Sequence, residues 1–172
     1  MSTVILSHGD TDGVTAAALA KAALGGGSVV FTHPVGLLHD FREFARGAEL
    51  VVVLDISLDE ANLRELNEEL ERFPGKVVYI DHHPLPRSGG IKAPNVTFVH
   101  EEGPCAAELA FRHFRLGWEI SRVALYGAIG DYALSTPWVG EAMARWDIKT
   151  LYLEAGILTL ALDKIGRNYD EK

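Results

Sequence analysis

The sequence predicts an α/β fold: a parallel sheet of about five strands with helices on both faces, and a helical C-terminal part. Three observations lead to this fold class. Short apolar runs alternate with segments of helical periodicity through the first two-thirds of the chain, which is the order of strands and crossover helices in a parallel sheet. The run at 50–54 is apolar at every position, as expected of a strand buried on both faces. After about Pro104 the pattern is helical as far as Ile165.

Five apolar runs are the expected strands, and helices are expected between them. An alanine-rich helix at 15–24 should stop at the three glycines that follow it, and a second helix is expected at 37–46. The sequence Ser-Leu-Asp-Glu at 57–60 has the form of a capping box and predicts that a third helix starts there. Leucines at spacings of three and four continue that helix to Phe73. The expected strands are 3–6, 29–31, 50–54, 77–80 and 96–99.

The composition indicates a single domain with a substantial core. The chain has 172 residues, of which 48% are hydrophobic, and this length fits one domain. We therefore expect residues 1–172 to form one domain, which leaves open that it is the N-terminal part of a longer protein. No apolar run approaches the roughly 20 residues needed to cross a bilayer, and the single cysteine, Cys105, excludes an internal disulfide. These features predict a cytoplasmic protein with no membrane partner.

The net charge bears on the kind of partner. A formal charge of -8 argues against a non-specific nucleic-acid binder, which is normally basic. Metal binding by acidic side chains would reduce this negative charge, because two divalent ions would bring it to about -4 and make the site locally positive.

Acidic and histidine side chains follow several of the expected strands. Open parallel sheets bind ligands at the carboxyl ends of their strands, so these clusters should meet at one edge of the sheet. A further aspartate, Asp131, lies in the apolar, glycine-rich segment 127–131. The clusters are His8, Asp10 and Asp12 after the first strand, Asp55 after the third, and Asp81, His82 and His83 after the fourth.

Such a set of side chains suits divalent cations. Several carboxylates in one place repel one another unless they are protonated or neutralised, and carboxylate with imidazole suits manganese, iron, zinc or magnesium-like ions. Two ions about 3.5–4 Å apart can activate a water and stabilise an in-line displacement at phosphorus. Asp55 stands alone at the end of its strand and is the natural residue to bridge two ions. Gly13 would let the chain approach closely at a helix N-terminus, which favours anions.

Each cluster has a plainer explanation when taken alone. The segment 10–13 could be a turn or helix cap, Asp55 a cap residue, and His82 with His83 a loop pair; their joint placement argues against coincidence. Two other histidines, His33 and His100, follow strands and are candidates for substrate contact. The remaining histidines, His39 and His113, are not expected to be ligands, and core or interface positions are expected for Trp118, Trp138 and Trp146.

Taken in order, these clusters resemble the four motifs of the DHH phosphoesterase superfamily over residues 4–131. That superfamily includes RecJ-like exonucleases, oligoribonucleases, cyclic-dinucleotide phosphodiesterases, exopolyphosphatases and family II inorganic pyrophosphatases. The resemblance implies that His8, Asp10 and Asp55 hold one manganese ion. It implies that a second ion is held by Asp12, Asp55, His82 and Asp131. His83 would then face the substrate phosphate, and Asp81 would orient the histidines.

The details of the motifs favour one branch. His8 lies two residues before Asp10, as in RecJ-like members, whereas the pyrophosphatases have a longer gap. Cys105 stands where relatives often carry serine or threonine, and these 172 residues do not contain the glycine-rich, histidine-containing motif that most catalytic relatives carry in a C-terminal domain. We therefore expect a RecJ-like single-strand nuclease or oligonucleotidase that uses two Mn²⁺ ions. Substrate binding would draw on a protein partner or a missing C-terminal domain.

Two alternatives remain at this stage. One is a phosphohydrolase of small molecules such as a dinucleotide, polyphosphate or pyrophosphate, and the other is a non-catalytic scaffold subunit. A further expectation concerns the two adjacent histidines: because consecutive residues leaving a strand diverge in direction, His82 and His83 should not serve the same ion in the same way. His83 would therefore be free to meet the phosphate.

Overall fold

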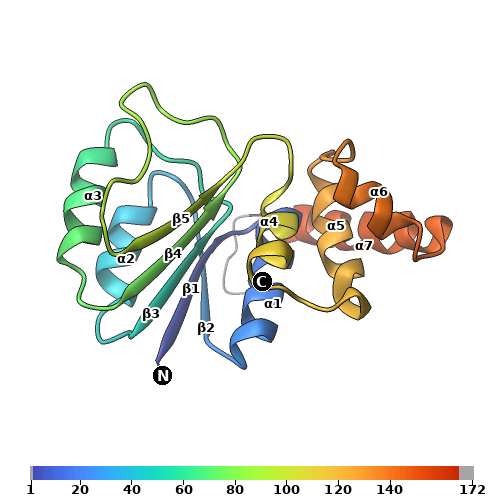
Figure 1. Ribbon diagram of the computed structural model, residues 1–172, viewed down its shortest axis with the longest axis horizontal. Helices are drawn as coiled ribbons and strands as arrows, with labels where there is room; N and C mark the ends of the chain where they lie inside the picture. Colours follow the sequence, from blue (N-terminus) through green and yellow to red (C-terminus); the bar gives the residue numbers. More distant parts are fainter. Residues whose placement is uncertain (1, 167–172) are drawn as a thin grey trace.

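The computed structural model describes residues 2–166 and contains a five-stranded parallel sheet (Figure 1). The strand order is β2-β1-β3-β4-β5, and every neighbouring pair is parallel. Each predicted strand is present, extended by one or two residues at one or both ends except at β3. The strands are β1 (Thr3–His8), β2 (Ser28–Thr32), β3 (Leu50–Leu54), β4 (Lys76–Asp81) and β5 (Val96–His100).

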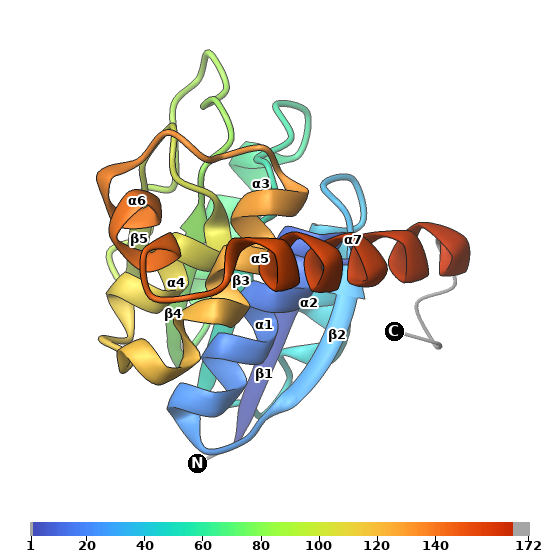
Figure 2. The same ribbon diagram turned by 90° about the vertical axis from the view of Figure 1, so that its right-hand side faces the viewer.

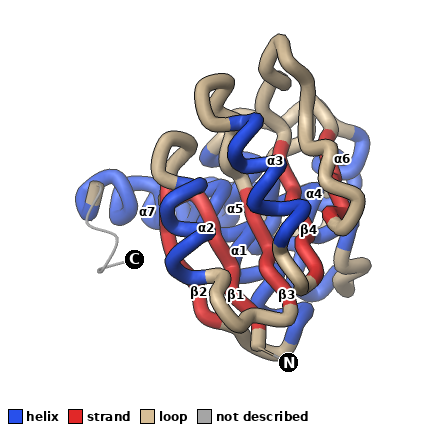
Figure 3. Tube along the Cα trace, turned by 90° about the vertical axis from the view of Figure 1, so that its left-hand side faces the viewer, coloured by secondary structure: helices blue, strands red, loops and turns tan. Residues whose placement is uncertain are grey.

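Helices cover both faces of the sheet, which confirms the predicted fold class. On one face lie α2 (Leu37–Phe44) and α3 (Leu63–Arg72), as Figure 3 shows. On the other face lie α1 (Thr11–Leu24) and α4 (Ala106–His113). A further helical layer packs outside these two helices (Figure 2). It consists of α5 (Ser121–Gly130), α6 (Pro137–Met143) and α7 (Ile148–Ile165), preceded by a short 3₁₀ turn at Trp118–Ile120.

The sheet separates two hydrophobic cores, and β3 contributes to both. Val52 and Leu54 belong to the core under α1 and α4, while Val51 and Val53 belong to the core under α2 and α3. All five residues of this strand are buried. Because successive side chains of a strand point to opposite faces, a run that is apolar at every position is what two cores require.

The first helix starts earlier than predicted. It begins at Thr11 rather than at residue 15, because the Asp10 side chain accepts a hydrogen bond from the backbone N–H of Gly13 and caps the helix. The helix ends where predicted: Gly25 is in the left-handed region with φ of 70°. The first polar motif therefore lies on a helix N-terminus rather than on a loop.

The predicted start of α3 is wrong. The helix begins at Leu63, six residues after the start of the expected capping box. Asp59 binds the following turn instead: its carboxylate accepts hydrogen bonds from the backbone N–H of Ala61 and the side chain of Asn62. This turn uses the residues that would otherwise have formed the first helical turn. The second helix is also shorter than expected and ends at Phe44.

The three tryptophans pack against the core, in agreement with the sequence expectation. Trp118 and Trp138 stack with ring centroids 6.0 Å apart, and the guanidinium of Arg145 covers Trp118 at 4.1 Å. Trp146 donates its indole N–H to Ser121 Oγ. Within the described part of the chain, no helix combines the length and the apolarity that a membrane span requires.

Candidate metal centre

The predicted site residues gather at the carboxyl edge of the sheet, seen at the upper ends of the strands in Figure 1. Strands β1, β3 and β4 are direct neighbours. Their last residues are His8, Leu54 and Asp81, so the loops that follow them must lie side by side. The strand order therefore brings three separate sequence clusters together.

His8 and Asp10 form one side of the cluster. His8 Nδ1 lies 2.8 Å from Asp10 Oδ2 and 3.8 Å from Asp55 Oδ2. Burial tends to raise the pKa of Asp10, but the hydrogen bond and charge of His8 and the N–H of Gly13 outweigh it, so that this pKa is lowered. Gly13 is required here because a Cβ atom would overlap the backbone carbonyl of His8.

Asp55 lies at the centre of the cluster and has an unusual backbone. It follows β3 directly, is 2% exposed, and has φ of 57°, in the left-handed region. Its N–H donates to the carbonyl of Ile80, which fixes the turn. Burial, followed by the charges of Asp12 and Asp10, raises the pKa of Asp55 well above its ordinary value. Strained backbone of this kind is often found at functional sites.

Asp12 is held by a helix that is distant in sequence. Its Oδ2 accepts a hydrogen bond from the N–H of Ala106 at 2.6 Å, and its Oδ1 accepts one from the N–H of Ala107 at 2.8 Å. Both donors are at the N-terminus of α4, where free N–H groups favour an anion. Burial nevertheless outweighs these hydrogen bonds and raises the pKa of Asp12 to about 7. Cys105 is buried and caps the same helix by accepting from the N–H of Glu108.

The contact between Asp12 and α4 predicts a structural cost when this carboxylate is removed. In Asp12→Ala, two buried N–H groups lose their acceptor, at about 1–3 kcal/mol each. Thermal unfolding in EDTA at pH 6, where Asp12 is largely protonated and little repulsion is relieved, should show a melting temperature several degrees lower. The matched variant Asp12→Asn keeps one acceptor oxygen and should lose less. Equal melting temperatures for the parent and the alanine variant would show that these hydrogen bonds contribute nothing.

His82 faces the carboxylates of three different elements. Its Nε2 lies 3.3 Å from Asp55 Oδ1, 3.7 Å from Asp12 Oδ2 and 3.7 Å from Asp131 Oδ2. Burial and the neighbouring ring of His83 lower the pKa of His82, although the surrounding carboxylates act in the opposite direction. A neutral imidazole is the form that binds metal ions.

His83 is bound to Asp81 and is more exposed than His82. Its Nδ1 lies 2.8 Å from Asp81 Oδ1, and this hydrogen bond raises the pKa of His83. Its side chain is 39% exposed, against 13% for His82. The expected divergence of the two rings is wrong: their centroids are 4.5 Å apart, and His83 Nδ1 is 4.0 Å from Asp55 Oδ1. Strand β4 ends at Asp81, so the alternation of side chains along a strand no longer applies to the residues beyond it.

Two glycines bring Asp131 to the cluster. Asp131 caps the C-terminus of α5, and that helix packs closely on the start of α1. A Cβ atom at Gly127 would lie 2.7 Å from Asp12 Oδ1, and one at Gly130 would lie 2.7 Å from Thr11 Cβ. The glycine-rich sequence before Asp131 is therefore explained by the close approach of the two helices.

The donor atoms form groups of the size that a metal ion requires. One group, His8 with Asp10 and Asp55, has the same members as the first set implied by the sequence resemblance, and another, Asp12 with His82 and Asp131, contains three of the four members of the second set, without Asp55. A third group joins Asp55 with His82 and His83. Among residues 2–166, Asp55 Oδ2 and His82 Nε2 are buried without a hydrogen-bond partner, which is costly unless another group satisfies them. Carboxylate oxygen and imidazole nitrogen without thiolate suit divalent ions of the manganese type, so these residues fit such ions.

Sequence reasoning missed two contacts of this site. The α4 amides that hold Asp12 are more than 90 residues away in sequence, and no local pattern signals them. His100, considered only for substrate contact, has its Nε2 2.7 Å from the carbonyl oxygen of His83 and so fixes the backbone of that residue. His33 accepts a hydrogen bond from the N–H of Gly36, which is a local turn contact.

The crowding of carboxylates predicts how stability depends on pH when metal is absent. The pKa values of Asp12, Asp55 and Asp131 are all raised, first of all by burial, and that of Asp12 reaches about 7 from an ordinary 3.8. Between those two values the folded state binds more protons than the unfolded chain, so stability falls as pH rises. Asp10, whose pKa is lowered, acts oppositely but only below its ordinary value.

We therefore expect the melting temperature in EDTA to be several degrees lower at pH 8 than at pH 5, measured by circular dichroism. The pKa values of His82 and His83 are shifted in opposite directions. Saturating Mn²⁺ should remove the loss at pH 8, because bound cations neutralise the carboxylates. A melting temperature in EDTA that rises from pH 5 to pH 8 would contradict this account.

A large concave surface lies elsewhere. The volume of this concavity is about 1330 Å³, and it is lined by residues at the amino ends of β3 and β4, including Leu50 and Lys76. That end of the sheet is opposite the cluster. Of the cations that line the concavity, Arg42 is paired with Glu65 and Glu69, and Arg72 lies beside Glu68 and Glu69. We assign this surface no role.

The fold and the cluster together define an α/β domain with a candidate dinuclear metal centre at the carboxyl edge of its sheet. The chain belongs to the DHH family: residues 2–134 match the model described as "DHH family, N-terminal domain". A comparison with curated proteins finds no match.

Several solved structures share the fold. RecJ from Thermus thermophilus in complex with Mn²⁺ is 23% identical with a TM-score of 0.60, over 82% of this chain and 23% of that one. An exonuclease RecJ bound to manganese is 24% identical with a TM-score of 0.60, over 96% of this chain and 48% of that one. The DHH domain of a protein described as a member of a ribosomal-protein family is 17% identical with a TM-score of 0.65, over 92% of this chain and 47% of that one. This chain thus spans less than half the length of each of these structures.

Proposed function

We propose that the protein is a metal-dependent phosphoesterase that uses two Mn²⁺ ions. The observation that carries the proposal is the position of Asp55, whose two oxygens lie near His8 on one side and His82 on the other. One ion would be held by His8, Asp10 and Asp55. The other would be held by Asp12, Asp55, His82 and Asp131. A carboxylate that lies between two donor groups is suited to bridge two ions at the separation of about 3.5–4 Å found in two-metal sites.

The ions, when bound, supply an activated water and stabilise the oxygens of an in-line displacement at phosphorus. The residues of the chain orient the reacting groups and balance the charge around them. Asp81 accepts the Nδ1–H of His83, so Nε2 carries a proton only when the ring is protonated. In that form Nε2 would donate a hydrogen bond to a non-bridging oxygen of the substrate. The raised pKa of His83 favours the protonated form, which stabilises charge that develops on that oxygen.

The preferred substrate is the phosphodiester bond of a single-stranded nucleic acid or oligonucleotide. The two-residue spacing of His8 and Asp10 favours a RecJ-like nuclease, and the RecJ structures with the same fold, both described with manganese, support that choice. The formal charge of -8 instead favours a small substrate such as a dinucleotide, polyphosphate or pyrophosphate, which we keep as the second candidate.

A hydrolysis panel distinguishes the two. Mn²⁺-loaded protein is incubated with single-stranded RNA, single-stranded DNA, a linear dinucleotide and inorganic polyphosphate, and each reaction is repeated with Asp55→Asn. Release of mononucleotides by the parent alone supports the nuclease. Turnover of polyphosphate only would support the second candidate, and no turnover of any substrate would contradict the phosphoesterase assignment.

A further inference from the structure

Tyr132 is the most exposed large apolar residue among residues 2–166. Its relative exposure is 89%, and it follows Asp131 directly in the chain. Within those residues its ring makes no aromatic contact and its hydroxyl makes no hydrogen bond. The tryptophans, in contrast, pack against the core. The fold does not use the side chain of Tyr132 for its own packing.

The backbone of Tyr132 makes this position still less suited to a tyrosine. The residue has φ of 56°, in the left-handed region. The N–H of Ala133 donates to the carbonyl of Ala128 at 2.9 Å, which is the Schellman pattern at a helix C-terminus. Glycine is the usual residue at the left-handed position of that pattern, and a bulky side chain there is sterically unfavourable.

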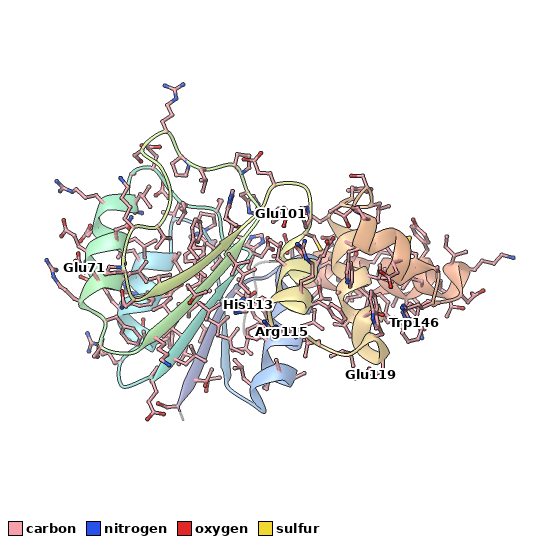
Figure 4. All side chains as sticks on the ribbon, in the orientation of Figure 1. Glu71, Glu101, His113, Arg115, Glu119 and Trp146 are labelled. Atoms are coloured by element: carbon pink, nitrogen blue, oxygen red, sulfur yellow. The ribbon has the colours of Figure 1, made fainter. Side chains whose placement is uncertain are left out.

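An unfavourable backbone alone does not indicate a function, as a second helix shows. Arg115 also has positive φ, 53°, and Leu116 donates to the carbonyl of Phe111 in the same pattern after α4. Figure 4 shows Arg115 near the lower end of α4, whereas Asp12 contacts the N-terminus of that helix. An eight-residue helix is about 12 Å long. Arg115 is therefore a matched position away from the cluster, while Tyr132 adjoins it.

We propose that Tyr132 stacks on a nucleobase next to the reacting phosphate and so selects substrates that carry bases. This inference rests on the proposed function and deepens it. Exposed aromatic rings serve as stacking surfaces for single-stranded nucleic acids, and they accept every base because each has a π-face. Asp131 Oδ2 lies 3.7 Å from His82 Nε2, so the residue after Asp131 is near the place where a phosphate would bind. A base is joined to its phosphate by one sugar, and a stacking ring is useful at that range.

The same edge carries other exposed apolar side chains. Val35 is 68% exposed on the loop after β2, and Leu85 is 42% exposed on the loop after β4. Both loops begin at the carboxyl ends of their strands, which is the edge of the sheet where the cluster lies. Apolar surface of this kind suits contact with a base or sugar and contributes nothing to the binding of a bare polyphosphate.

The variant Tyr132→Gly separates this role from a structural one, because stability and binding should change in opposite directions. Glycine adopts a positive φ without steric strain, so thermal unfolding of the variant in EDTA should show a higher melting temperature. Binding of a short single-stranded DNA in Ca²⁺ should weaken about tenfold, a typical effect of losing one stacked base. Binding of an abasic strand of the same length should not change. Tyr132→Trp should bind the base-bearing strand as tightly as the parent does.

The control is Arg115→Gly, which should gain stability in the same way and bind both strands like the parent. Equal binding of the base-bearing strand by Tyr132→Gly and the parent would overturn the proposal and point to a protein partner for this ring. Equal weakening for both strands would overturn it as well. A parent that binds neither strand would refute the stacking role, while hydrolysis of polyphosphate by that same parent would leave the phosphoesterase assignment standing.

Discussion

Asp55→Asn should lower turnover by at least about a hundredfold while it raises the melting temperature of the metal-free protein. The loss follows because this carboxylate would serve both ions, and their stabilisation of charge in the transition state is worth several kcal/mol. The gain follows because Asp55 is buried with a raised pKa beside Asp12 and Asp10, so its charge destabilises the fold at neutral pH. Asparagine is chosen because it tolerates the left-handed backbone of residue 55.

Three measurements on the same preparation test this prediction. They are steady-state turnover with Mn²⁺, metal content by elemental analysis, and thermal unfolding in EDTA at pH 8, where about 1 kcal/mol corresponds to roughly 2–4 °C. Glu71→Gln is the control, since it removes one negative charge from α3, on the far side of the sheet in Figure 4. A lower melting temperature for Asp55→Asn in EDTA would mean that Asp55 is a structural residue.

His83→Ala should lower the catalytic rate by roughly a hundredfold or more, with metal content close to that of the parent. A hydrogen-bond donor aimed at developing charge contributes on the order of 2.7–4 kcal/mol to a transition state. His83 is suited to this role because Asp81 binds its Nδ1 and 39% of its side chain is exposed. Elemental analysis and turnover are measured together on the variant and the parent.

The structure suggests a specific alternative role for His83, that of a metal ligand. Asp55, His82 and His83 also form a group that could hold one ion, and the two imidazole rings are close together. If His83 is a metal ligand, the alanine variant will lose bound metal along with activity. If His83 only packs the loop before Pro84, activity will be unchanged. His39→Ala, which removes an exposed histidine from α2, should match the parent in both measurements.

The strands were predictable because a buried parallel strand appears in the sequence as a short, continuous apolar run. The run at 50–54 is apolar throughout, and the structure has β3 at those residues. Helix starts were less predictable, since they depend on which side chain reaches which N–H. Asp10 caps α1, which begins four residues before the expected start, and Asp59 forms a turn where the Ser57 capping box was expected.

The candidate site divides in the same way. Its residues could be named from sequence, because acids and histidines that follow neighbouring parallel strands must meet at one edge. Their partners could not. The N–H groups that hold Asp12 belong to Ala106 and Ala107, which carry no polar side chain. The positive φ of Asp55 and Tyr132 is likewise set by the three-dimensional turn. It could not be predicted from sequence, because glycine is the residue that normally signals a positive φ.

The most direct test of a shared two-ion site is anomalous diffraction from crystals of the protein soaked in Mn²⁺. We expect two anomalous peaks, one beside His8 and Asp10 and the other beside Asp12, His82 and Asp131, with Asp55 in contact with both. A single peak, or two peaks of which either is out of contact with Asp55, would contradict the account.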